Sequence, residues 1–169
     1  MVIVNTGNGK GKSTAAIGTA IRALGWGWKI FMVQFMKGKW DTGEKRFIEK
    51  IGPDFTIVNA DCGFSWNSTD TQSDIEACRT IWEKAKGAIN GEEYDLVILD
   101  EINVVLHLNY LPMSEVIETV RNRPSWKHII LTGRNASPEM IEAADCVSEI
   151  KNIKHPFDSG KVAQKGIDF

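Results

Sequence analysis

A glycine-rich segment between a short apolar run and a helix-patterned stretch restricts the fold of this chain more than any other feature. The apolar run is Val2–Val4, and the segment after it reads Thr6-Gly7-Asn8-Gly9-Lys10-Gly11-Lys12-Ser13. Apolar residues then recur at helical spacing up to Leu24, and Gly25 ends the pattern. A strand, a glycine-rich turn and a helix in this order are typical of a phosphate loop, in which backbone N–H groups converge on phosphate oxygens.

The residues of this loop are expected to bind a nucleotide. Lys12 brings a positive charge to the phosphates, and the Ser13 hydroxyl is placed to bind Mg²⁺. The common pattern, G-x-x-x-x-G-K-[ST], has its first glycine where this chain has Thr6, so the loop is one residue shorter than usual. The predicted nucleotide contacts in this segment are Thr6, Gly7, Asn8, Gly9, Lys10, Gly11, Lys12, Ser13 and Thr14.

Buried strands alternate with amphipathic helices along the rest of the chain. Apolar runs predict strands at Ile30–Phe35, Phe55–Val58, Leu96–Leu99, His128–Thr132 and Cys146–Ile150. Helical spacing predicts helices at Gly43–Ile51, Gln72–Ala88, Met113–Arg121 and Pro138–Ala144. The alternation predicts a three-layer α/β fold, with a mainly parallel sheet and helices on both faces. We expect a single domain over residues 1–169, with 151–169 forming a C-terminal tail packed near the site.

A pair of carboxylates, Asp100 and Glu101, follows the strand predicted at Leu96–Leu99. Ligands of parallel sheets bind at the carboxyl ends of the strands, so these residues are expected next to the phosphate loop. Carboxylate oxygens in that place can hold Mg²⁺ directly or through water. The predicted metal-side residues are therefore Ser13, Asp100 and Glu101.

The composition excludes several other classes of protein. A length of 169 residues suits one domain, and a net charge of −2 gives no general attraction to nucleic acid or to an acidic membrane surface. No apolar stretch approaches the roughly 18 residues that span a bilayer. Three distant cysteines without a C-x-x-C pair, together with the lack of a signal-peptide pattern, favour a cytoplasmic protein.

Several segments, in order and spread over nearly the whole chain, resemble the ATP:cob(I)alamin (corrinoid) adenosyltransferases, a family with a RecA-like phosphate-loop fold. The shortened phosphate loop is itself part of that family's pattern. The segments that carry the resemblance are Thr6 to Ala16, Val33-Gln34-Phe35-Met36-Lys37-Gly38, Gly63-Phe64-Ser65-Trp66, Leu99-Asp100-Glu101-Ile102-Asn103, Leu131-Thr132-Gly133-Arg134-Asn135-Ala136, and His155-Pro156-Phe157-Asp158 with Ala163-Gln164-Lys165-Gly166-Ile167.

The resemblance implies transfer of the 5′-deoxyadenosyl group of ATP to the cobalt of a reduced Co(I) corrinoid such as cobalamin. Inorganic triphosphate leaves as the cobalt–carbon bond forms. Because Co(I) is already a strong nucleophile, the protein is expected to position the reactants and to stabilise charge rather than to supply a general base. Mg²⁺ and ATP are the implied cofactor and co-substrate.

The resemblance also implies roles for single residues. Phe64 and Trp66 are implied to press on the lower face of the corrin ring and to exclude the lower axial ligand, which leaves cobalt four-coordinate and easier to reduce. Aromatic side chains suit that task because they offer no ligand atom. The residues implied to carry the transfer are Lys12, Phe64, Trp66 and Arg134. The nucleotide contacts implied outside the loop are Arg22, Arg134 and Asn135.

Partners are implied in the same way. We expect a homodimer and a flavoprotein electron donor, and we expect neither nucleic acid nor a membrane as partner. Many relatives carry a segment before the first strand that helps to cover the site. The resemblance here begins at that strand, so closure over the corrinoid is expected to be weaker or to be supplied differently.

Two other functions fit parts of the pattern. A phosphate-loop ATPase or kinase would use Glu101 to activate water or a hydroxyl acceptor, and it would need no aromatic loop. A module that binds ATP and a corrinoid without turnover would deliver or sense the corrinoid. The aromatic pair Phe64 and Trp66 argues against the ATPase or kinase, and only weakly against the binding module.

Overall fold

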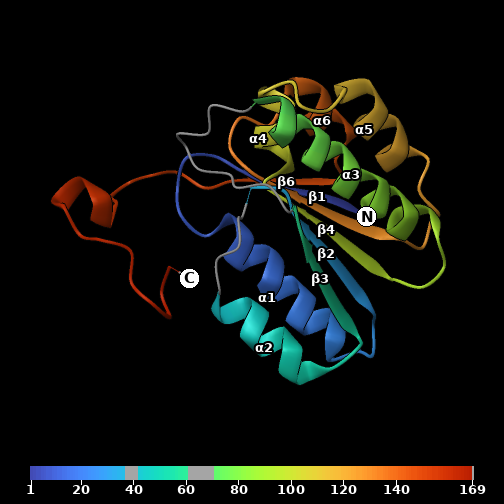
Figure 1. Cartoon of the computed structure of the whole chain (residues 1–169), viewed down its shortest axis with the longest axis horizontal. Coiled ribbons are helices and arrows are strands. Elements are labelled where there is room, and N and C mark those ends of the chain that lie inside the picture. The colour runs from blue at the N-terminus through green and yellow to red at the C-terminus, as the bar shows by residue number, and fades with distance from the viewer. Residues whose placement is uncertain (37–41, 61–70, 169) are drawn as a thin grey trace.

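The structure is a computed structural model that describes residues 1–36, 42–60 and 71–168 (Figure 1). Within these residues the chain forms one parallel sheet, and its strands are β1 (Val2–Thr6), β2 (Ile30–Gln34), β3 (Phe55–Asn59), β4 (Leu96–Asp100), β5 (His128–Thr132) and β6 (Cys146–Glu149). The helices are α1 (Lys12–Leu24), α2 (Gly43–Ile51), α3 (Thr71–Asn90), α4 (Ile102–His107), α5 (Met113–Arg121) and α6 (Pro138–Ala143), with a 3₁₀ turn at Pro156–Ser159. The strand order is β3-β2-β4-β5-β1-β6.

Helices cover both faces of the sheet (Figure 1). The helices α1 and α2 pack on one face, and α3 to α6 pack on the other. Side chains alternate along each strand, so Val97 and Leu99 of β4 point to the α3 side while Ile98 points to the α1 side. The predicted three-layer α/β fold with a parallel sheet is confirmed.

The helix α1 lies close to the sheet because its inward face carries small side chains. Ala16 and Ala20 are completely buried against Ile30, Ile98 and Ile130 of three strands. A larger side chain at either alanine would push the helix outward, because protein interiors are close-packed. This contact fixes the first turn of α1, and with it the glycine-rich segment that enters the helix.

Two features of the sheet edge were not predicted from the sequence. The strand β5 lies between β1, which leads into the glycine-rich segment, and β4, which ends in the carboxylates. A short helix, α4, follows Glu101 directly. Its six residues are too few to show a helical period, and they begin at a turn in which Glu101 has a φ of 63°.

A buried lysine secures the connection between α3 and β4. The Lys127 ammonium group donates hydrogen bonds to the carbonyl oxygens of Ala88, Gly91 and Tyr94, and its side chain is completely buried. Burial lowers the pKa of Lys127, whereas the charge of Asp95 acts in the opposite direction. The three carbonyls compensate the buried charge, and the ammonium group in turn satisfies carbonyl oxygens at and beyond the end of α3.

None of the helices in the described ranges is both long enough and apolar enough to cross a lipid bilayer.

Candidate functional site

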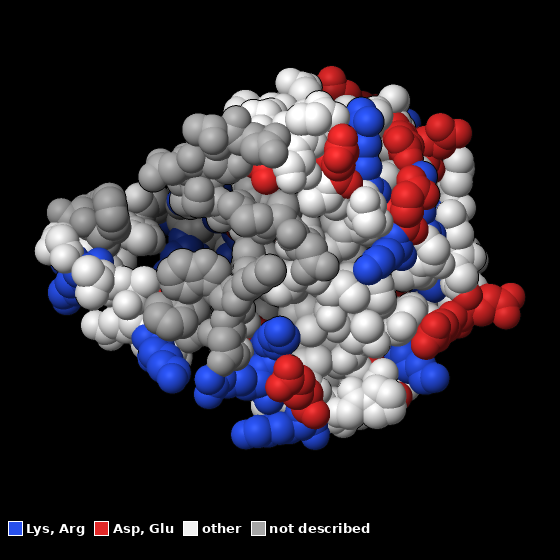
Figure 2. Space-filling view, in the orientation of Figure 1, with Lys and Arg blue, Asp and Glu red and all other residues white. Residues whose placement is uncertain are grey.

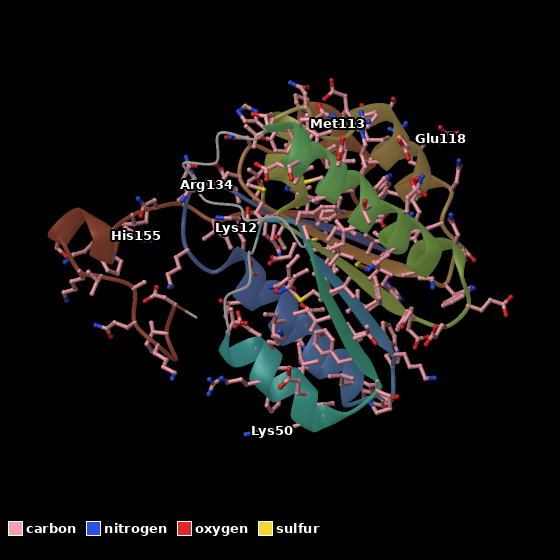
Figure 3. All side chains as sticks on the ribbon, in the orientation of Figure 1. Lys12, Lys50, Met113, Glu118, Arg134 and His155 are labelled. Carbon is pink, nitrogen blue, oxygen red and sulfur yellow. The ribbon has the colours of Figure 1, made fainter. Side chains whose placement is uncertain are left out.

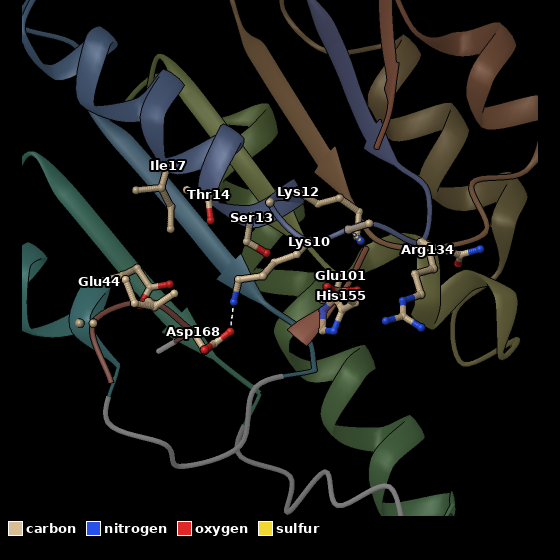
Figure 4. Close-up of a pocket in the computed structure, with 16 residues that line it drawn as sticks. Lys10, Lys12, Ser13, Thr14, Ile17, Glu44, Glu101, Arg134, His155 and Asp168 are labelled. Carbon is tan, nitrogen blue, oxygen red and sulfur yellow. Dashed lines mark hydrogen bonds and ion pairs between the residues drawn. The ribbon is translucent and has the colours of Figure 1, made fainter. Parts of the chain in front are cut away.

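A cavity of about 480 Å³ opens at the carboxyl edge of the sheet, where the segments after β1, β4 and β5 meet (Figure 4). The start of α2 and the C-terminal segment complete its wall. The lining residues are Asn8, Gly9, Lys10, Gly11, Lys12, Ser13, Thr14, Ile17, Gly43, Glu44, Glu101, Arg134, His155, Gly166, Ile167 and Asp168.

The glycine-rich segment is braced from behind by the chain that leaves β6. The amide of Gly9 donates to the carbonyl of Ile150 at 2.7 Å, and the amide of Ile150 donates to the carbonyl of Thr6 at 2.8 Å. A Cβ atom on Gly7 would lie 2.5 Å from the Ile150 oxygen, and one on Gly9 would lie 2.6 Å from the Lys151 oxygen. Both glycines are therefore required by packing inside the protein, and the amide of Gly9 is already occupied.

The ammonium group of Lys12 lies at the centre of this segment. Its Nζ donates to the carbonyls of Gly7 at 2.9 Å and Gly9 at 2.8 Å, and the side chain is 7% exposed. Burial lowers the pKa of Lys12, the Glu101 charge raises it, and the Arg134 charge lowers it further. A polyanion in the cavity would favour the charged form of Lys12, since an opposite charge within a few ångströms stabilises it.

The two carboxylates after β4 have different surroundings. Asp100 is completely buried; Thr132 donates to its Oδ1 at 2.8 Å and Gln34 donates to its Oδ2 at 3.3 Å. Glu101 lines the cavity, and its backbone amide donates to the Thr132 hydroxyl at 2.9 Å. Glu101, rather than Asp100, therefore faces a bound ligand directly.

The loop after β5 is attached to the ends of its two neighbouring strands. The amide of Ala136 donates to the Thr6 hydroxyl at 3.2 Å, next to β1, and the Asn103 side-chain amide donates to the Gly133 carbonyl at 3.3 Å, beyond β4. Gly133 has a φ of 127°, and a Cβ there would lie 3.0 Å from that of Asn103. These attachments place Arg134 at the cavity wall.

The structure brings most, but not all, of the predicted nucleotide contacts to the cavity. Thr6, Gly7 and Asn135 do not line it, and the Thr6 hydroxyl is occupied by Ala136. Arg22 is exposed near the end of α1, about 15 Å along the helix from Lys12 at a rise of 1.5 Å per residue. Within one chain, Arg22 is therefore remote from the loop. The aromatic pair, Phe64 and Trp66, lies outside the described residues.

Several lining residues were not assigned a role from the sequence. Glu44 lies in the first turn of α2, and His155 and Asp168 come from the C-terminal segment. Asp168 forms an ion pair with Lys10 across the mouth of the cavity (Figure 4). The sequence did mark part of the C-terminal segment, because His155 and Gly166–Ile167 belong to the segments that carry the family resemblance. An isolated acidic residue such as Glu44 belongs to no pattern that could have marked it.

Basic side chains surround the cavity more widely. Figure 2 shows lysine and arginine side chains beside α2 and along the C-terminal segment. Exposed members of this group are Lys45, Arg46, Lys151, Lys154, Lys161 and Lys165. A positive surface around a cleft attracts anions to it.

Together these features define a phosphate-loop nucleotide-binding protein with a RecA-like arrangement of strands. The solved structure of the flagellar accessory protein FlaH from Methanocaldococcus jannaschii has the same fold, with a TM-score of 0.52 and 13% identity, covering 88% of this chain and 69% of FlaH.

The whole chain, residues 1–169, matches the family described as ATP:corrinoid adenosyltransferase BtuR/CobO/CobP. The corrinoid adenosyltransferase of Escherichia coli K12 is 44% identical over 169 residues, which are all of this chain and 85% of that protein. The corrinoid adenosyltransferase CobA of Salmonella typhimurium is 41% identical over the same share of each chain. The chain belongs to the ATP:corrinoid adenosyltransferase family.

The left-handed conformation of Glu101 gives a testable prediction. An L-residue in this region costs about 1–2 kcal/mol, which glycine avoids. The free energy of unfolding of Glu101→Gly is therefore expected to be about 1 kcal/mol higher than that of Glu101→Ala. Within a helix the order is the reverse, because alanine is there more stable than glycine. Both variants lose the carboxylate and are expected to turn over more slowly, with a residual rate that can still be measured. Denaturant unfolding of the two variants measures the difference, and a more stable alanine variant would contradict the strained turn.

Proposed function

We propose that the chain transfers the 5′-deoxyadenosyl group of ATP to the cobalt of a reduced Co(I) corrinoid, releasing triphosphate and forming adenosylcobalamin. The observation that carries this proposal is a phosphate-loop cavity in a chain that matches the corrinoid adenosyltransferase family from its first residue to its last. Relatives at 41–44% identity carry the same activity in their names.

The electrons of this reaction balance without a protein base. The Co(I) lone pair attacks the 5′ carbon, the carbon–oxygen bond breaks, and its electron pair leaves on triphosphate. Cobalt becomes formally Co(III), and no proton has to be removed. The residues of the site therefore need only hold the two substrates in line and stabilise the charge that develops on the leaving group.

We propose that Lys12 and Arg134, which both line the cavity, stabilise that charge. Among the described residues, the cavity wall has three cations, Lys10, Lys12 and Arg134, and three carboxylates, Glu44, Glu101 and Asp168. These charges balance, so a triphosphate brings an excess of negative charge that a divalent cation can offset. Mg²⁺ would supply that charge when it is bound.

The residues present fit Mg²⁺. Ser13 and Glu101 both line the cavity and offer the oxygen atoms that Mg²⁺ prefers. The described part of the chain holds no group of three or more His, Cys, Asp and Glu side chains that could cage a metal. Mg²⁺ commonly takes its remaining ligands from phosphates and water. We propose that Ser13 and Glu101 contact Mg²⁺ directly and that Asp100 contacts it through water.

The pose of ATP follows from the bond that breaks. A 5′ carbon turned into the protein would be hidden from a bulky corrin ring. We therefore place the terminal phosphate deep in the loop, in the region that usually holds the inner phosphates, and the ribose toward the corrinoid. The shortened loop supports a pose that differs from that of common phosphate-loop enzymes.

The proposal also covers the compartment, the oligomeric state and the electron donor of the enzyme. We propose that it works in the cytoplasm as a homodimer, and that a flavoprotein donates the electrons that make Co(I). An oxidised corrinoid has no nucleophilic lone pair on cobalt, so a reductant is required before transfer.

Lys12→Ala tests the site and the reaction together. The variant is expected to lose turnover by at least about 100-fold, because a preorganised charge-stabilising donor is removed. The measurement is incubation with ATP, Mg²⁺ and chemically reduced cobalamin, followed by absorption spectroscopy of the cobalt–carbon bond. Lys50→Ala is the matched control, since Lys50 is an exposed lysine of α2 outside the cavity (Figure 3).

The outcomes separate the three functions considered. Transfer by the native chain and by Lys50→Ala, but not by folded Lys12→Ala, supports the proposal. Phosphate release without a cobalt–carbon bond would indicate an ATPase or kinase. Binding of both substrates without any turnover would indicate a binding module.

Phe64 and Trp66 are proposed to exclude the lower ligand of cobalt. The double variant Phe64→Ala with Trp66→Ala is expected to bind cob(II)alamin in a five-coordinate form, because nothing then keeps water or base from the metal. Electron paramagnetic resonance of the bound Co(II) form distinguishes the two coordination states. A fully four-coordinate spectrum from the double variant would assign the pair to packing alone.

A further inference from the structure

The last residues of the central strands form a buried polar row beneath the cavity. Gln34 ends β2, Asp100 ends β4 and Thr132 ends β5, and all three are at most 1% exposed. Alternation along the strands places them on the side of the sheet that carries α1, because Val33, Leu99 and Leu131 before them face α3. The row therefore lies on the side of the sheet from which α1 and its glycine-rich segment rise.

One hydroxyl group joins the two carboxylate residues of the site. The Glu101 amide donates to Thr132 Oγ1 at 2.9 Å, so that oxygen is the acceptor. The single hydroxyl proton is then directed to Asp100 Oδ1, at 2.8 Å. Thr132 thus holds the side chain of Asp100 and the backbone of Glu101 at the same time.

We infer that Thr132 is a positioning residue for the adenosyl transfer, acting through Glu101. The Glu101 backbone adopts an unfavourable left-handed conformation with φ 63° and ψ 19°. Its amide is held by Thr132, and the preceding Asp100 is held by Thr132 and by Gln34. These bonds keep the turn in the conformation that presents Glu101 to the cavity.

The position of β5 explains why a threonine on this strand can do so. The strand lies between β1, which leads into the phosphate loop, and β4, which ends in the carboxylates. Its last residue, Thr132, therefore lies between the strand ends that lead into the two segments. Gly133 and Arg134 follow it at once, so the same strand end also positions a cation of the cavity wall.

The inference rests on the proposed function, and its test uses the whole chain of residues 1–169. Thr132→Val keeps the shape of the side chain and removes the hydroxyl, whereas Thr132→Ser keeps the hydroxyl. We expect the valine variant to lose about 10- to 100-fold in kcat, the range for groups that orient the ligands of a metal or substrate. The KM for ATP is expected to stay the same, because the phosphate loop is untouched, and the serine variant is expected to keep most of the activity.

A double-variant cycle separates positioning from general stability. If Thr132 acts through Glu101, adding Thr132→Val to Glu101→Ala causes no further loss of turnover. Losses that multiply in the double variant would overturn the inference, as would a Thr132→Val enzyme with native kcat. Should the valine variant not fold, Thr132→Ala is compared with Thr132→Ser in the same cycle. Failure of the native chain to form the cobalt–carbon bond would instead contradict the proposed function.

Discussion

The parallel pairing of β5 with both β1 and β4 is the constraint on which the site depends. Because these three strands are parallel and hydrogen-bonded to one another, their carboxyl ends lie at the same edge of the sheet. The segments that follow them supply the phosphate loop, Glu101 and Arg134. A pairing of β1 directly with β4 would leave no strand end between Asp100 and the loop. The insertion of β5 fills that place with the Thr132 hydroxyl, which ties the carboxylate turn to the sheet.

Close packing behind the phosphate loop has a similar consequence. The backbone at Ile150 lies so near Gly7 and Gly9 that no side chain fits there. The loop is thus held in shape by protein contacts before any ligand binds, and Lys12 is fixed by two carbonyls of that loop. Preorganisation of this kind lets charged groups act on a leaving triphosphate without first having to reorganise.

The sequence predicted the fold well, because its signals are local. Apolar strands, helical spacing and the glycine-rich turn each depend on neighbouring residues, and together they specified a parallel α/β sheet. The position of β5 between β1 and β4 could not be read in this way, since strand order depends on contacts between distant segments. The six residues of α4 were missed because they are too short to show a period.

The site was predicted in part for the same reason. Lys12, Ser13 and Glu101 stand in recognisable patterns and do line the cavity. Thr6 stood in the loop pattern too, but its hydroxyl accepts a hydrogen bond from the amide of Ala136, in the loop after β5. Asp168 reaches Lys10 only through the folded path of the C-terminal segment, and no spacing in the sequence records that contact.

The proposed reaction breaks the bond between the 5′ carbon and oxygen of ATP. Phosphorus nuclear magnetic resonance of the product mixture tests it, using ATP and an analogue with a methylene bridge between its β and γ phosphates. If this bond breaks, ATP yields intact inorganic triphosphate and the analogue yields the intact bridged triphosphate, each formed together with the alkylated corrinoid. Diphosphate and phosphate from the first turnover, or no transfer from the analogue although it binds, would contradict it.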